Sequence, residues 1–177
     1  MLLEIPKFHK DVALIGFKNF YKLRSVYSEI IGLRKFDHFS INVESPDKKL
    51  AFLSCNPAVS LTLIKSGLLP YDGTISPTVY RRKDVYIWDK NYIPEYSEKI
   101  KEIKEYKFGI HKGIVLVRNI GGFYIMYSFA TKGNGVDFLE DVLESKSDYL
   151  KMGDHCYSLI RSLYSKHLIE HCAPQIR

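Results

Sequence analysis

The chain has 177 residues, of which 46% are hydrophobic, 26% are charged and 14% are aromatic, and its formal net charge is +6. This length suffices for one domain with its own core, and the composition is typical of a globular protein and excludes a disordered one. No run approaches the ~18 apolar residues of a membrane span, and the first residues lack the apolar segment of a signal peptide. We therefore expect a cytoplasmic protein that makes no membrane contact.

Cysteine use and charge distribution agree with that expectation. Cys55, Cys156 and Cys172 are odd in number and show no CxxC spacing, which argues against a disulfide scaffold and for a reducing compartment. Lysines and arginines are scattered among acidic residues, so a solvated basic face explains the net charge better than a nucleic-acid surface does.

The first third of the chain predicts a helix followed by a hairpin. Apolar residues at helical spacing indicate a helix over about residues 9–32, with a possible interruption at Gly16. Residues 36–43 and 50–55 are two strands joined by a turn. The first strand alternates, so that one side carries three apolar residues and the other three polar ones: Phe39, Ile41 and Val43 against His38, Ser40 and Asn42.

The middle of the chain predicts short helices and one strand. Asn56 can cap a helix that begins at Pro57 and ends near Gly67. Ser76-Pro77 opens a second short helix by the same logic. A strand over Val85–Trp88 and an amphipathic helix over residues 93–103 follow.

The central feature is a hairpin within Tyr106–Thr131, with β-branched and aromatic runs at residues 114–117 and 123–129. Asn119–Gly122 supplies the residues with positive φ that a tight turn needs. Two long helices complete the chain. Since such apolar strands are covered on both faces, we predict an α/β fold, an α/β/α sandwich around a five-stranded antiparallel sheet.

Catalytic motifs are lacking, so we expect neither an enzyme nor a cofactor. The sequence contains no nucleophile elbow, phosphate loop or dinucleotide fingerprint, and Gly121-Gly122 joins two strands. His155, His167 and His171 could form a zinc site on the last helix, but a partly exposed helix end that carries histidines is the simpler interpretation. We therefore predict no metal.

Aromatic residues are concentrated between the two hairpins, at Tyr71, Tyr80, Tyr86, Trp88, Tyr92 and Tyr96. Such residues can line a pocket for an apolar ligand and offer it hydrogen bonds. They can equally pack a helical layer onto the sheet, and the sequence leaves both interpretations open.

Five segments resemble the autoinducer-binding domain of LuxR-type transcriptional regulators, and the similarity extends from about Phe17 to Leu163. The segments are Ser54–Pro57, Ser76–Val79, Val85–Trp88, Phe108–Ile114 and Tyr127–Ala130. The resemblance implies a PAS/GAF-like sandwich that binds a signal between the sheet and one helical layer. It also implies a dimer.

The resemblance implies a set of ligand-binding positions. Trp88 matches the tryptophan at the lactone end of the pocket, and Ser128 matches a hydroxyl residue on the last strand. Asn56, Ser60 and Ile64 stand where the family has aromatic residues, and Ser76 stands where it has an aspartate that accepts the ligand amide proton. Tyr71 and Tyr80, from the aromatic cluster between the hairpins, complete the set of expected pocket residues.

These substitutions remove an ionised acceptor and an indole donor, and a charge-assisted hydrogen bond contributes roughly 1.5–3 kcal/mol. We therefore expect a small lipophilic signal other than a standard acyl-homoserine lactone. The alternative is a ligand-free interaction module that pairs with another regulator. Residues 1–172 are expected to form one sensor domain, and residues 173–177 the start of a linker to a helix-turn-helix domain, absent from this chain, through which alone DNA would be bound.

Overall fold

A computed structural model describes residues 4–167 and 174–176 of the chain. Their strands form one sheet in the order β1-β3-β2-β6-β5-β4. The strands are β1 (Lys7–Phe8), β2 (His38–Glu44), β3 (Lys49–Ser54), β4 (Val85–Ile87), β5 (Lys112–Ile120) and β6 (Phe123–Thr131).

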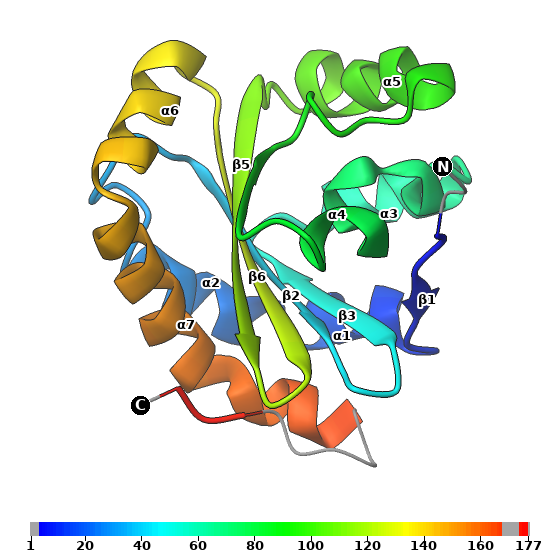
Figure 1. The fold of residues 1–177 in the computed structure, drawn as a ribbon, viewed down its shortest axis with the longest axis vertical. Helices are drawn as coiled ribbons and strands as arrows, with labels where there is room; N and C mark the ends of the chain where they lie inside the picture. Colours follow the sequence, from blue (N-terminus) through cyan, green and yellow to red (C-terminus); the bar gives the residue numbers. More distant parts are fainter. Residues whose placement is uncertain (1–3, 168–173, 177) are drawn as a thin grey trace.

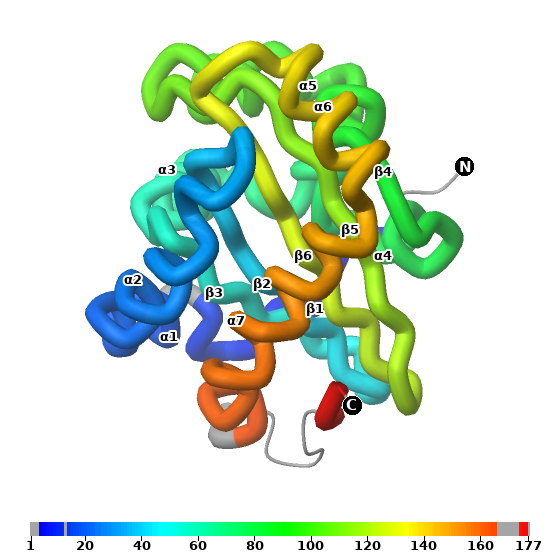
Figure 2. Tube along the Cα trace, turned by 90° about the vertical axis from the view of Figure 1, so that its left-hand side faces the viewer, coloured from blue at the N-terminus to red at the C-terminus, as the bar shows by residue number. Residues whose placement is uncertain are grey.

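Helices cover both faces of this sheet (Figure 1). On one face lie α2 (Phe20–Ser28), α6 (Gly135–Glu144) and the long α7 (Lys146–His167), which cross in front of the strands in Figure 2. On the other face lie α3 (Pro57–Lys65), α4 (Pro77–Tyr80) and α5 (Pro94–Lys101), with α1 (Val12–Lys18) beside β3. The second face also carries three short helical segments. Two are 3₁₀ turns, η1 (Leu69–Tyr71) and η2 (Gly73–Ile75), and the third is the π-helical η3 (Glu102–Lys107).

The α/β class is confirmed, but the prediction of a five-stranded, wholly antiparallel sheet is wrong. Strands β2 to β6 pair antiparallel, whereas β1 adds a sixth strand that runs parallel to β3. The sequence could not reveal β1, because two residues are too few to show an alternating pattern.

The central hairpin is confirmed. Gly121 and Gly122 have φ values of 58° and 81°, and Ile120 pairs with Phe123 across this two-residue turn. Both strands are longer than predicted, because the backbone ladder continues to Lys112 and Thr131 at the open end of the hairpin.

The first helix breaks at a different residue from the predicted one. Gly16 lies inside α1, and the chain bends at Asn19 between α1 and α2. The Asn19 side chain donates to the Ile15 carbonyl over 2.9 Å, and asparagine commonly competes in this way with the helical backbone. The predicted cap at Asn56 is confirmed, since its side chain accepts from the Ala58 amide.

The two sheet faces have different chemistry, as the alternation in β2 predicted. Phe39, Ile41 and Val43 lie in the larger apolar core under α2, α6 and α7. His38 and Asn42 point to the opposite face and are nevertheless only 5% exposed, because the second helical layer covers them. The fold thus encloses polar groups on one side of the sheet.

Gly153 brings α7 close to the sheet, which gives a test of the packing. A Cβ atom at this residue would lie 2.3 Å from the buried Tyr127 ring, whereas one at Gly16 would lie 3.6 Å from Pro57. We predict that Gly153→Ala lowers the free energy of unfolding by about 1–2 kcal/mol, because overpacking outweighs the gain in helix propensity.

The matched control, Gly16→Ala, should leave the free energy of unfolding unchanged or raise it by up to about 1 kcal/mol. Urea denaturation measures both variants. Equal effects of the two substitutions would contradict this account of the close approach.

Candidate functional site

A cavity of about 50 Å³ lies between the sheet and the second helical layer. Strands β2, β3 and β6 form its floor, and α3, η1, η2 and η3 form its walls. Polar side chains predominate in the lining: His38, Ser40, Asn42, Ser54, Ser60, Asp72, Thr74, Lys104 and Ser128. Buried polar groups need partners, so the arrangement of these side chains indicates what the cavity can hold.

Three serines cross the floor as one row. Ser40 of β2 pairs with Ser54 of β3 on one side and with Ser128 of β6 on the other. Residues at paired positions lie on the same face of a sheet, so the three hydroxyls are neighbours. The row offers both donors and acceptors to a polar group above it.

Trp88 closes one end of the cavity. Its indole Nε1–H donates to the Ser128 hydroxyl over 3.0 Å, and its backbone amide bonds to the Gly113 carbonyl over 2.9 Å. A Cβ atom at Gly113 would come within 2.1 Å of the indole ring, so only glycine at this position in β5 leaves room for the ring.

Lys104 and Asp72 form a buried ion pair in the cavity wall. Lys104 Nζ lies 2.7 Å from Asp72 Oδ2, and each side chain is 4% exposed. The same ammonium lies 4.2 Å from the centre of the Trp88 ring and 4.9 Å from that of Tyr92. Burial lowers the pKa of Lys104, although Asp72 acts in the opposite direction.

Neighbouring groups hold the Asp72 carboxylate in place. Its Oδ1 accepts from the Thr74 amide over 3.1 Å and from the Thr74 hydroxyl over 2.8 Å. The Tyr86 hydroxyl donates to the Thr74 carbonyl over 2.6 Å and so ties the η2 turn to β4. Together these bonds orient the carboxylate toward Lys104.

His38 lies at the edge of this cluster, with its ring centre 6.1 Å from that of Trp88. Burial and the nearby positive charges of Lys104 and Lys132 lower its pKa to about 4. At neutral pH the imidazole is therefore uncharged and can both donate and accept a hydrogen bond.

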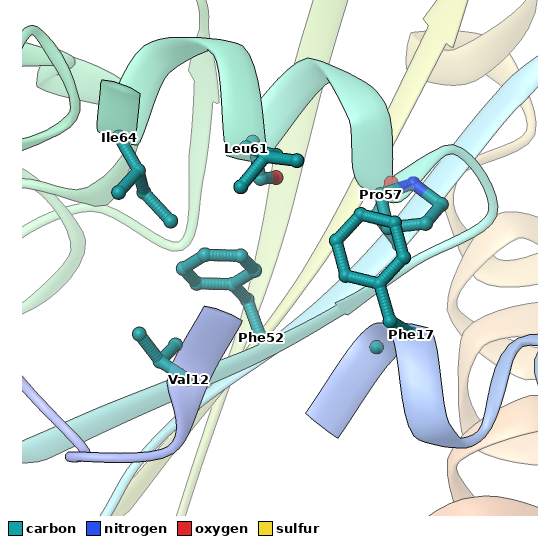
Figure 3. A pocket seen from close by; sticks show the side chains of 9 residues that line it. Val12, Phe17, Phe52, Pro57, Leu61 and Ile64 are labelled. Carbon is teal, nitrogen blue, oxygen red and sulfur yellow. The ribbon is translucent and has the colours of Figure 1, made fainter. Parts of the chain in front are cut away.

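A small apolar cleft adjoins the polar cavity between α1 and α3 (Figure 3). Phe52 rises from β3 between Val12 and Ile64, while Phe17 lies next to Pro57. Phe52, Ser54 and Ser60 line both spaces. The two spaces are therefore adjacent, one polar and the other apolar.

Four of the predicted site residues line these spaces. Trp88, Ser128 and Ser60 border the polar cavity, and Ser60 and Ile64 border the apolar cleft. The structure thus brings together residues from α3, from β6 and from the position that follows β4.

The other four predicted residues are not among the residues that line either space. Asn56 caps α3, and the Ser76 hydroxyl lies 3.0 Å from that of Thr78. Tyr71 stacks on Tyr96 with ring centres 4.0 Å apart, and Tyr80 donates a hydrogen bond to buried Glu44.

Sequence reasoning missed Asp72 and Lys104, which carry the charges of the cavity. Asp72 lies four residues before Ser76, which the sequence comparison placed at the family's aspartate position, and it belongs to a loop whose course no periodic pattern predicts. For Lys104 a signal existed, because it follows buried Ile100 by four residues and therefore continues the apolar face of that helix.

Other features of the described residues are less suited to a site. Two larger hollows, of about 360 and 390 Å³, are open to solvent on the outer surface. No group of three or more His, Cys, Asp or Glu in the described part of the chain could hold a metal ion. His171 and the His167 side chain, on which the zinc alternative depended, lie outside that part. Among the described helices, none is both long and apolar enough to cross a membrane.

Comparisons with protein-family models and with curated proteins find no match. Solved structures do match. Escherichia coli SdiA superposes with a TM-score of 0.61 and 16% identity over 86% of this chain and 67% of SdiA. CepR2 from Burkholderia cenocepacia, an N-acylhomoserine lactone-dependent LuxR family transcription factor, has a TM-score of 0.56 and 9% identity over 82% of this chain and 92% of CepR2. The chain has the fold of LuxR-type autoinducer-binding domains.

The resemblance inferred from sequence is thus confirmed for the fold, which is what identities this low establish. A further SdiA structure contains octanoyl-rac-glycerol and matches with a TM-score of 0.56 and 15% identity. It aligns with 87% of this chain, which spans 61% of that SdiA chain.

Neutral, buried His38 should make stability depend on pH. Its pKa of about 4 lies below the ordinary value of 6.5, so the unfolded state binds a proton more tightly. The contribution of His38 to the free energy of unfolding is fully present above pH 6.5. It is lost progressively as the pH falls from 6.5 through 4, because the unfolded state takes up the proton first. We predict that the wild type loses about 3 kcal/mol more than His38→Gln over this range. Urea denaturation at a series of pH values measures the difference, and parallel curves for the two proteins would contradict it.

Proposed function

We propose that this chain is the ligand-sensing and dimerisation domain of a LuxR-type transcriptional regulator. The observation that carries the proposal is the polar cavity of about 50 Å³, with the Trp88–Ser128 bond at one end and an apolar cleft beside it. Polar groups that converge on a concave space are a feature of small-molecule sites. The fold shared with SdiA and CepR2 supports the same function.

The signal we propose is a small lipophilic molecule with a polar head. The serine row and His38 can bond a hydroxyl or carbonyl group, and the apolar cleft beside Phe52, with a volume of about 10 Å³, can take a short alkyl tail once its side chains move apart. The described cavity has room for only a few water-sized groups, so a ligand must move side chains as it enters. Phe52 is the apolar side chain that lines both spaces.

A standard acyl-homoserine lactone suits this cavity less well. Asp72, the carboxylate that its amide proton would need, already accepts from Lys104 and twice from Thr74. Ser60 provides no indole donor for the lactone carbonyl. We therefore propose a signal that depends on hydroxyl or carbonyl contacts rather than on an amide donor.

The partners we propose follow from this function. The domain would pair with a second copy of itself and would reach DNA only through a domain outside this chain. The alternative, a ligand-free module that pairs with another regulator, is favoured by one observation, the cavity volume of only about 50 Å³. The cytoplasm is the compartment in which such a regulator would act.

Native mass spectrometry of the purified chain separates these possibilities. The sensor function predicts a mass excess over the denatured chain, or a bare dimer that gains mass when 1-octanoyl-glycerol is added. A monomer that remains bare at saturating octanoyl-glycerol would contradict the sensor function and favour the interaction module.

Loss of the Ser128 hydroxyl should weaken the binding of such a ligand. Ser128→Ala removes the acceptor of the Trp88 indole and a possible ligand contact, and Trp88→Ala removes the end wall of the cavity. We predict that octanoyl-glycerol raises the unfolding midpoint of the wild type and that each variant binds it at least about tenfold more weakly, a loss of about 1.4 kcal/mol. Ser158→Ala, on the exposed surface of α7, is the matched control and should respond like the wild type. Equal stabilisation of all four proteins would remove both residues from the site.

A further inference from the structure

We propose that Asp72, Trp88 and Tyr92 form an alkylammonium site that the chain itself occupies with Lys104. The side chain of Lys104 thereby takes the place of the donor group of a ligand. The substitution of Lys104 for a ligand donor rests on the proposed function, whereas the ammonium site exists whether or not a signal binds. Three residues around the Lys104 Nζ atom define the site.

The three residues surround the Lys104 ammonium as they would surround a free alkylammonium ion. Asp72 supplies a carboxylate oxygen 2.7 Å from Nζ, and two aromatic faces lie 4.2 and 4.9 Å away. A carboxylate combined with aromatic faces is the chemistry that recognises ammonium groups, and the cation–π contact is stronger where water is excluded. Few hydrogen-bonding positions on the cation face solvent, since the side chain is 4% exposed.

The backbone delivers Lys104 to this position. It lies in the π-helical turn η3, in which it is the buried residue. The Lys104 carbonyl accepts from the Ile110 amide over 2.8 Å, which ties the π-helical turn to the segment just before β5. Single π-helical turns are rare and occur often at functional sites, so this backbone geometry is an observation independent of the side-chain contacts.

The consequence for ligand selection is direct. With Lys104 in place, Asp72 has no strong attraction for the donor group of a neutral ligand, because three donors already bond to it. The Trp88 indole N–H already donates to Ser128, so the hydroxyl groups of the serine row on the cavity floor are what remains for a ligand. The tethered lysine therefore selects for ligands that bind the serine side of the cavity and against ligands that must donate to Asp72.

Chemical rescue tests the ammonium site. Lys104→Ala removes three carbons and the nitrogen, which together correspond to n-propylammonium. We expect n-propylammonium chloride to raise the unfolding midpoint of Lys104→Ala saturably, by about 3–6 °C at tenfold its dissociation constant. The wild type, in which the site is filled, should not show this saturable rise.

Two controls assign the effect to charge and to Asp72. n-Propanol has nearly the same shape without the charge and should not rescue Lys104→Ala. The double variant Asp72→Asn/Lys104→Ala lacks the carboxylate and should not respond to n-propylammonium. Equal responses to the amine and the alcohol, or equal responses of the single and double variants, would overturn the proposal.

A measurement on the wild type covers the case in which Lys104→Ala does not fold. Reductive methylation followed by peptide mass spectrometry should leave Lys104 unmodified while exposed lysines, such as Lys151, react. Modification of Lys104 at the rate of Lys151 would overturn the proposal. Rescue by n-propylammonium without any octanoyl-glycerol binding would support the ammonium site and contradict the sensor function, so the two failures are distinguishable.

Discussion

The buried ion pair between Lys104 and Asp72 is the interaction on which the second half of this fold depends. Removing two charges from water costs several kcal/mol per ion, so the pair persists only where other groups compensate. Here Thr74 orients the carboxylate, Trp88 and Tyr92 face the ammonium, and Tyr86 ties the η2 turn to the sheet. Loss of one partner would leave an unpaired buried charge, which typically costs 3–5 kcal/mol. The pair therefore joins the loop before α4 to the helix before β5.

The rest of the architecture separates an apolar side of the sheet from a polar one. Under α2, α6 and α7 the strands contribute a continuous apolar core that includes Phe39 and Phe129. On the opposite face a row of serines, His38 and Asn42 lies beneath the second helical layer. A domain that needed only stability would gain more from apolar residues at those positions, because buried polar groups contribute little net free energy. Their placement around a cavity is what gives the second face its proposed role.

Sequence patterns predicted the features that repeat and missed those set by tertiary contacts. The alternation in residues 36–43 was enough to divide the side chains of β2 between two faces, and two glycines were enough to locate the central turn. The pattern could not show that the polar face is covered. The apolar pattern of this helix ends at Ile103, and a lysine after it does not look like a buried residue. Lys104 nevertheless lies four residues after Ile100 and therefore on the same buried face of the helix. Asp72 lies in a loop whose course depends on its bonds to Thr74 and Lys104, so alignment placed the expected acidic position at Ser76.

The central claim is that the cavity beside Trp88 binds a signal, and the indole resonance of this residue tests it most directly. The chain contains one tryptophan, so its indole N–H gives a single, assigned signal in a ¹⁵N–¹H spectrum. Because that N–H bonds to Ser128 inside the cavity, the account predicts that 1-octanoyl-glycerol shifts the resonance saturably. An unchanged indole resonance in protein that mass spectrometry shows to carry the ligand would contradict the account, because the molecule would then bind elsewhere.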